Sequence, residues 1–155
     1  YYGDEEKDCK CSGYEVTKYQ KKISGPILDR IDLQIQVPRV SIEELQSKNK
    51  DTVNADKMRA KVLEARKKQQ KRFKEAEKKI FTNSEMSSKL CDELLELDAD
   101  TEKFLKQMYE KNMVSARGYY RILKTARTIA DLADHDRIAL EHLSEAFQYR
   151  LRENS

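Results

Sequence analysis

The stretch SARGYYRILKTARTIADLA, residues 115–133, decides the fold expected for this chain. Apolar side chains recur along it three or four positions apart, the spacing of one face of an α-helix. This face comprises Tyr119, Ile122, Leu123, Ala126, Ile129, Ala130 and Ala133. Ser115 stands just before it, where a serine can cap the first turn. A helix with so broad an apolar face must pack against other helices. The stretch therefore predicts the centre of a helical bundle.

Helical spacing continues on both sides of this stretch. The expected helices run from Asn54 to Ile80, from Asn83 or Ser84 through Leu94, from Asp98 through Met108, and from Ile138 to Leu151. Short polar connections between helices of this length favour a compact bundle. We therefore expect one helical domain over residues 54–155, preceded by a linker over residues 41–53.

Residues 1–40 have a different pattern. Ser12 can cap a short helix, and Pro26 suits the first turn of another, where its missing N–H costs nothing. Leu33, Ile35 and Val37 then alternate with polar residues, as in a β-strand. One strand cannot make a sheet, so either its partner strands belong to another part of the protein or it pairs irregularly. The expected fold class is mainly α, with one strand before the bundle.

Composition excludes some classes of protein. The 31 basic and 28 acidic residues give a net charge of only +3, so overall charge does not indicate a nucleic-acid partner. No apolar run is long enough to predict a transmembrane helix. Three cysteines is an odd number and favours a reducing, cytoplasmic location over a disulfide framework. Of these, Cys91 lies between apolar helical positions and is expected in the core.

Catalytic motifs are largely absent. The sequence contains no G-x-x-x-x-G-K-[ST] phosphate loop and no apolar strand ending in paired acids that hold magnesium. His135 and His142 have no cysteine or serine partner and are expected to be ordinary surface or interhelical residues. The chain alone is therefore not expected to be a complete enzyme.

Two arginines are candidates for binding phosphate. Arg30, in ISGPILDRIDL (residues 23–33), stands between a short helix and the expected strand, where its planar fork can reach phosphate oxygens. The alternative is a surface ion pair with Asp29 or Asp32. Arg117 lies in the first turn of a helix, where the macrodipole disfavours a cation unless an anion is bound. Its alternative is a basic outer face shared with Arg121, Lys124 and Arg127.

The long helix expected after Asn54 is strongly basic. Its cations over residues 57–79 include Lys61, Arg66, Lys67, Lys68, Lys71, Arg72, Lys74, Lys78 and Lys79. Such a stripe can follow a nucleic-acid backbone. It can equally be the solvated face of an amphipathic helix, and the sequence leaves both interpretations open.

Several blocks resemble the magnesium-chelatase-like AAA+ family, in its ComM/YifB branch. They are CKCS (9–12), ISGPILDRIDL (23–33), VLEARKKQQKRF (62–73), SARGYYRILKTARTIADL (115–132) and HLSEAFQYR (142–150). The resemblance covers nearly the whole chain, in the right order. CKCS and the last block resemble the ComM branch more than the chelatase branch.

The resemblance implies both a fold and a function. Residues 1–40 would be the tail of the AAA+ α/β ATPase core, partly mobile in this chain, and residues 54–155 its α-helical lid. Arg30 matches the family's arginine finger, a catalytic residue, and Arg117 matches its second sensor, which binds the nucleotide. Family members form rings of identical subunits, hexameric ones being expected, and use ATP with Mg²⁺. The ComM branch drives DNA branch migration in natural transformation, whereas the chelatase branch inserts magnesium into porphyrin.

The resemblance also leaves alternatives. In the family an earlier cysteine pair precedes the one at Cys9 and Cys11, so these two could be half of a four-cysteine zinc site. With only these two thiolates, we expect no metal in this chain. The alternative function is a free-standing helical nucleic-acid-binding or adaptor module, or a magnesium chelatase subunit.

Overall fold

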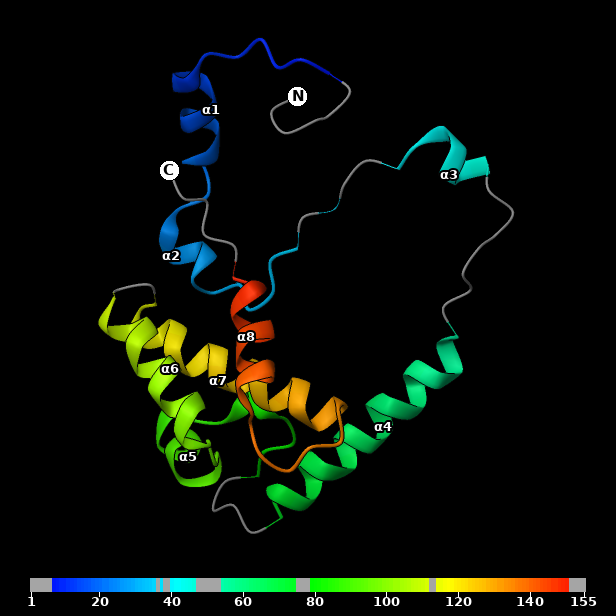
Figure 1. Cartoon of the computed structure of the whole chain (residues 1–155), viewed down its shortest axis with the longest axis vertical. Helices are drawn as coiled ribbons and strands as arrows, with labels where there is room; N and C mark the ends of the chain where they lie inside the picture. The colour runs from blue at the N-terminus through cyan, green and yellow to red at the C-terminus, as the bar shows by residue number, and fades with distance from the viewer. Residues whose placement is uncertain are drawn as a thin grey trace. The chain divides into compact units, whose positions relative to one another are not determined.

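The computed structural model describes residues 7–35, 37, 40–46, 54–74, 79–111 and 114–150. The chain divides into two compact units, Tyr1–Val53 and Asn54–Ser155, and each is described by itself (Figure 1). The assignment of these two parts to an ATPase core and a lid stays a prediction.

The first unit contains three short helices, α1 (Gly13–Gln20), α2 (Gly25–Leu28) and α3 (Ile42–Gln46). Ser12 caps α1 as expected, and its hydroxyl accepts from the Glu15 N–H at 3.3 Å. The Glu15 carboxylate accepts in return from the Ser12 N–H at 2.8 Å, which completes a capping box. Pro26 stands in the first turn of α2, as predicted.

The expected strand over Leu33–Val37 is wrong for the residues that the structure describes. Residues 33–35 and 37 belong to no strand, and Ile35 is 67% exposed. A strand is stabilised by hydrogen bonds to a neighbouring strand, and no described residue supplies one. The alternation of apolar and polar residues was therefore not enough to predict a strand.

The second unit is a helical bundle, and the mainly α fold class is confirmed. Its helices are α4 (Ala55–Arg72), the 3₁₀ helix η1 (Asn83–Glu85), α5 (Ser88–Leu94), α6 (Ala99–Glu110), α7 (Ala116–Leu132) and α8 (Leu140–Gln148). Helix α7 packs against α4, η1, α5, α6 and α8 (Figure 1). The stretch from Ser115 to Ala133 thus forms the centre of the bundle.

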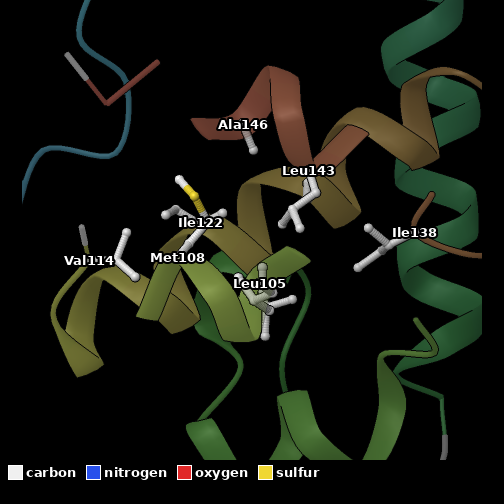
Figure 2. Packing of buried hydrophobic residues seen from close by; sticks show 9 residues of the cluster. Leu105, Met108, Val114, Ile122, Ile138, Leu143 and Ala146 are labelled. Atoms are coloured by element: carbon white, nitrogen blue, oxygen red, sulfur yellow. The ribbon is translucent and has the colours of Figure 1, made fainter. Parts of the chain in front are cut away.

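The core of the bundle gathers around α7. Leu105 from α6, Ile122 from α7 and Leu143 from α8 are each at most 2% exposed (Figure 2). Burying a side chain of this size contributes about 1.5–3 kcal/mol. A smaller cluster holds Phe73, Met86 and Cys91, so the expected core position of Cys91 is confirmed.

Three predicted helix caps are present. The side chain of Asn54 accepts from the Lys57 N–H at 3.1 Å, and Asp98 accepts from the Thr101 N–H at 2.7 Å. Ser115 accepts from the Gly118 N–H at 3.0 Å. These caps are local, which is why the sequence predicts them.

Three predicted boundaries are wrong. Helix α4 ends at Arg72 and not at Ile80. Ser87, not Asn83 or Ser84, caps α5. The last helix begins at Leu140 because Ile138 forms a parallel β-bridge with Leu97.

Among the described residues, no helix combines the length and apolarity that a membrane span requires.

Candidate functional site

Arg30 lies directly after α2 in the first unit and is exposed. The turn that carries it is closed by backbone hydrogen bonds from Asp29 N–H to Gly25 and from Arg30 N–H to Ile27. Its guanidinium donates to the Pro26 carbonyl at 3.0 Å. A guanidinium carries five N–H donors, so this bond fixes the side chain through one of them. The ion pairs with Asp29 or Asp32 that we considered stay an alternative.

Arg117 lies in the first turn of α7 in the second unit, and it is exposed. Ser115 occupies the cap position and satisfies the N–H of Gly118. Among the described residues, the guanidinium of Arg117 has no hydrogen bond or ion pair. The structure thus presents this cation at the positive end of the helix macrodipole.

A second arginine, Arg150, reaches the same turn from the end of α8. A Cβ atom added to Gly118 would lie 3.6 Å from both the Cζ and a terminal nitrogen of Arg150, and 3.3 Å from the Ser115 hydroxyl. The Arg150 guanidinium thus lies against the first turn of α7, at a distance that an added Cβ would tolerate, and only the Ser115 hydroxyl would be crowded. This position of Arg150 was not predicted from the sequence. Two sequence features could have indicated it, namely the glycine in the first turn of a helix and the arginine that ends HLSEAFQYR.

The amino end of α7 is consequently rich in positive charge. No acidic side chain lies in its first turn, whereas α4, α6 and α8 have Asp56, Asp100 and Glu102, and Glu141 there. The Arg117 guanidinium at this helix amino end repels the partial positive charge of the N–H groups. A bound anion would offset that repulsion.

A buried ionic network joins α4 and η1 to α7, and its centre, Asp131, was not predicted from the sequence. The Asp131 carboxylate accepts from Arg72 on α4 and from Asn83 on η1, at 3.0 and 2.9 Å. It also accepts from the Arg127 Nε at 3.1 Å. Burial by itself raises the pKa of Asp131, but hydrogen bonds from Arg72 and Asn83 and the charge of Arg127 outweigh it and hold the pKa below its ordinary value.

This network corrects two expectations about basic residues. Arg127 is only 2% exposed, so it does not belong to the basic outer face that we considered for α7. Its terminal nitrogens donate to the carbonyls of His135 and Asp136 in the loop after α7. Arg72 is turned toward Asp131 and not toward solvent. Arg127 and Asp131 stand four positions apart, and this helical spacing could have predicted that the two side chains interact.

The basic stripe of α4 is partly occupied by contacts within the protein. Lys68 forms ion pairs with Asp134 and Asp136, at 2.8 and 3.5 Å. Lys67 pairs with Glu64 on the same helix, at 2.8 Å. These pairs leave fewer cations for a nucleic-acid backbone than the sequence suggested. They favour the solvated-face interpretation for the carboxyl-terminal half of α4, which contains Lys67 and Lys68.

Three potential metal ligands lie together at the start of α8. His135 Nδ1 lies 3.0 Å from His142 Nε2, and the Glu141 carboxylate is 3.7 and 3.5 Å from these two nitrogens. However, the Ala139 N–H donates to the Nδ1 of His142 at 3.0 Å. The proton of the neutral ring must then sit on Nε2, which donates to His135 and has no lone pair for a metal. We interpret the cluster as a hydrogen-bonded cap of α8.

Cys9 and Cys11 lie before α1, half-buried and exposed respectively. Hydrogen bonding to Cys11 lowers the pKa of the Cys9 thiol, and the interaction with Cys9 raises that of Cys11. The two thiols are thus neighbours. A structural zinc site needs four ligands, so a shared zinc site stays a prediction.

Comparison with protein families identifies both parts of the chain. Residues 52–150 match the model of the C-terminal region of magnesium chelatase, subunit ChlI. Residues 1–45 match the model of magnesium chelatase, subunit ChlI, itself. Together these matches confirm the resemblance drawn from the sequence.

Individual relatives agree with the family match. The chain is 35% identical over 141 residues to competence protein ComM of Haemophilus influenzae, covering 91% of this chain and 26% of that protein. It is 29% identical to the uncharacterized protein YifB of Salmonella typhimurium, covering 91% of this chain and 27% of that protein. The chain thus spans about a quarter of the length of these relatives.

Proposed function

This chain belongs to the magnesium chelatase subunit ChlI family, and we propose that it is the C-terminal part of a ring-forming AAA+ ATPase acting on DNA. In this proposal residues 1–40 complete the ATPase core and residues 54–155 form its lid. The Haemophilus relative is named a competence protein. We therefore propose DNA branch migration during natural transformation as the work that ATP hydrolysis drives.

The observation that carries this proposal is the positive charge at the amino end of α7. Arg117 is exposed there, and Arg150 packs against the neighbouring Gly118. Phosphate oxygens are the anions that a helix amino end and a guanidinium bind best. We assign Arg117 the role of the second sensor, through which the lid responds to the nucleotide of its own subunit.

Arg30 has a different role in this proposal. Its hydrogen bond to the Pro26 carbonyl holds an exposed guanidinium next to a short helix. ATP with its Mg²⁺ supplies the phosphoryl group that is transferred to water. A guanidinium from a neighbouring subunit stabilises the charge on the phosphoryl oxygens, an effect of about 10³–10⁵ in rate. We assign Arg30 as that arginine finger.

Mixing variant subunits tests the assignment of Arg30. In the longer protein, Arg30→Ala should nearly abolish ATP hydrolysis while ATP binding and ring assembly persist. Mixing it with a variant defective in the phosphate loop should restore part of the activity, because some interfaces then combine an intact loop with Arg30. Lys18→Ala, at another exposed cation of the first unit, is the matched control and should hydrolyse ATP normally.

Two results would contradict this assignment. Normal turnover in Arg30→Ala would show that the side chain forms only a surface ion pair, worth no more than about 1 kcal/mol. Absence of rescue in rings shown to be mixed would exclude action between subunits.

For Arg117→Ala, we expect weaker coupling of nucleotide binding to lid position with the lid still folded. An unfolded lid would contradict the sensor role.

A further inference from the structure

The amino-terminal half of α4 has an apolar face that the helical unit leaves exposed. Ala65 and Gln69 on this helix are buried. Met58 and Val62 lie on the same face, because they precede these two residues by three to eleven positions at helical spacing. Met58 is nevertheless 58% exposed and Val62 49%. The face of α4 that is buried at Ala65 and Gln69 thus extends toward the amino end of the helix, where the helical unit does not cover it.

Cations flank this exposed face on both sides. At 100° per residue, Lys61 borders one side of the Met58–Val62 line and Arg59 borders the other. Both side chains are exposed, and among the described residues neither forms an ion pair. A nucleic-acid backbone is bound through cations and polar groups, whereas exposed apolar side chains on a packing face indicate a protein partner. We call Met58, Arg59, Lys61 and Val62 the α4 face.

A surface of opposite charge lies elsewhere on the same unit. Every charged side chain over residues 91–102 is acidic. Asp92 on α5 and Glu102 on α6 are both close enough to Tyr119 to raise the pKa of its hydroxyl, although burial of the ring raises it more. Tyr109, which is 48% exposed, stacks edge-on against Tyr119 at 6.2 Å. We call Asp92, Glu102, Tyr109 and Tyr119 the acidic tyrosine patch.

The two surfaces cannot meet within one copy. In Figure 1 the amino end of α4 lies beyond the carboxyl-terminal end of α7, whereas α5 and α6 lie near the amino-terminal half of α7. Each surface combines apolar area with charged side chains, Arg59 and Lys61 on the α4 face and Asp92 and Glu102 on the patch, so the named charges are opposite in sign. Lys106, which lies on α6 between Glu102 and Tyr109, is paired with Glu110 at 3.9 Å. We propose that the α4 face of one copy of this chain docks on the acidic tyrosine patch of a second copy. Such a contact joins two different surfaces, so repetition produces a ring when the rotation closes.

This inference rests on the ring-forming part of the proposed function and names its contact. Sedimentation of the chain over a concentration series tests it. The 18.2 kDa chain should self-associate at low salt and dissociate as salt screens the charges. A variant carrying Arg59→Glu and Lys61→Glu should associate at least about tenfold more weakly, because like charges then face each other. A variant carrying Asp92→Lys and Glu102→Lys should behave in the same way.

Mixing the two variants is the decisive step. An acidic α4 face then meets a basic patch, and a basic α4 face meets an acidic patch, so association should return in the mixture. The matched control reverses Lys71, near the carboxyl end of α4, and Lys74, just after that end, to glutamate, and both cations are exposed. It changes the net charge equally and should associate like the wild type. Far-UV circular dichroism establishes that each variant is folded.

Four results would overturn the proposal. They are a wild-type chain that stays monomeric, a charge-reversed variant that associates normally, a control as weak as the variants, or a folded mixture that does not recover. A monomeric chain that binds labelled duplex DNA only with an intact α4 face would make this face a nucleic-acid surface instead. If the longer protein forms rings unaffected by the reversals, this contact is wrong while the proposed function stands. If it forms no rings, the proposed function fails as well.

Discussion

At the scale of single residues, Asp131 decides how α4 is held against α7. Its carboxylate is buried and accepts from Arg72, Arg127 and Asn83. A buried ion pair adds little stability over a well-packed apolar pair, but losing one partner leaves a buried charge uncompensated. The network therefore specifies which side chains meet at this interface.

Removing Asp131 should be costly. Asp131→Ala leaves Arg127 buried without its carboxylate and should lower the free energy of unfolding by about 3–5 kcal/mol. Urea unfolding followed by circular dichroism measures this. Asp136→Ala, which removes an almost fully exposed carboxylate nearby, is the control and should change stability by less than about 0.5 kcal/mol. A loss below about 1 kcal/mol in Asp131→Ala would show that the network contributes little.

His142 should make the stability of the bundle depend on pH. Burial lowers its pKa, and the charges of His135 and Arg127 lower it further, although Glu141 opposes them. The folded protein then binds a proton less readily than the unfolded chain. The free energy of unfolding should consequently fall as the pH drops below the ordinary pKa of histidine, about 6.5.

The variant His142→Gln separates this effect from other titrations. Glutamine at this third helical position can still accept from the Ala139 N–H, as in a capping box, but it does not titrate. Between pH 7 and pH 5 the variant should lose less stability than the wild type in urea titrations. His135→Gln, at an exposed neighbour, should keep most of the wild-type slope. Equal slopes in wild type and His142→Gln would contradict the assignment.

At the scale of elements, α7 is capped at both ends, by a side chain at its amino end and by backbone hydrogen bonds at its carboxyl end. Ser115 caps its amino end. At the carboxyl end, the Asp134 and His135 N–H groups donate to the Asp131 and Ala130 carbonyls, and Asp134 has a φ of 65°. This is a Schellman motif with aspartate in the left-handed position that glycine usually occupies. The loop that it starts carries the carbonyls that Arg127 binds.

The two halves of α4 should differ in local stability. Every side chain over residues 55–64 is exposed, whereas Ala65 and Gln69 are buried against the bundle. We expect the amides of residues 59–64 to exchange with solvent at least about tenfold faster than those of residues 69–72. Hydrogen exchange read by NMR at low protein concentration and high salt measures this in the monomer. Equal protection along the helix would show that part of the same chain covers its first half.

At the scale of the whole molecule, the core belongs to the second unit. Among the described residues, every buried one lies between Ala65 and Ala146. The first unit exposes large apolar side chains such as Tyr14, Tyr19 and Val37. The two units therefore make unequal contributions to stability, and nearly all burial of apolar surface stabilises the bundle.

Removing residues 1–53 should leave the bundle intact. The chain over residues 54–155 contains both core clusters and the Asp131 network. Its free energy of unfolding should therefore stay within about 0.5 kcal/mol of that of the bundle in the longer chain. Thermal and urea unfolding of the two lengths, followed at a helix-specific wavelength, provide the comparison. A much less stable short chain would show that the first unit packs on the bundle.

The sequence by itself determined the features that depend on neighbours along the chain. The helical spacing of residues 115–133 predicted α7 and its central place. The caps at Asn54, Asp98 and Ser115 followed from side chains within three positions of the N–H groups that they satisfy. The place of Arg117 in the first turn of α7 was predicted in the same way, and the family followed from whole blocks of sequence.

Only the tertiary structure decided the features that join distant positions. Asn83 or Ser84 was expected to begin the helix that ends at Leu94, but the Asn83 side chain bonds to Thr128 and Asp131. Ile138 resembled the start of a helix, but it pairs with Leu97. Arg150 reaches Gly118 only because α8 packs on α7. Local spacing carries no information about which remote side chain satisfies a buried polar group, because that depends on how the helices pack.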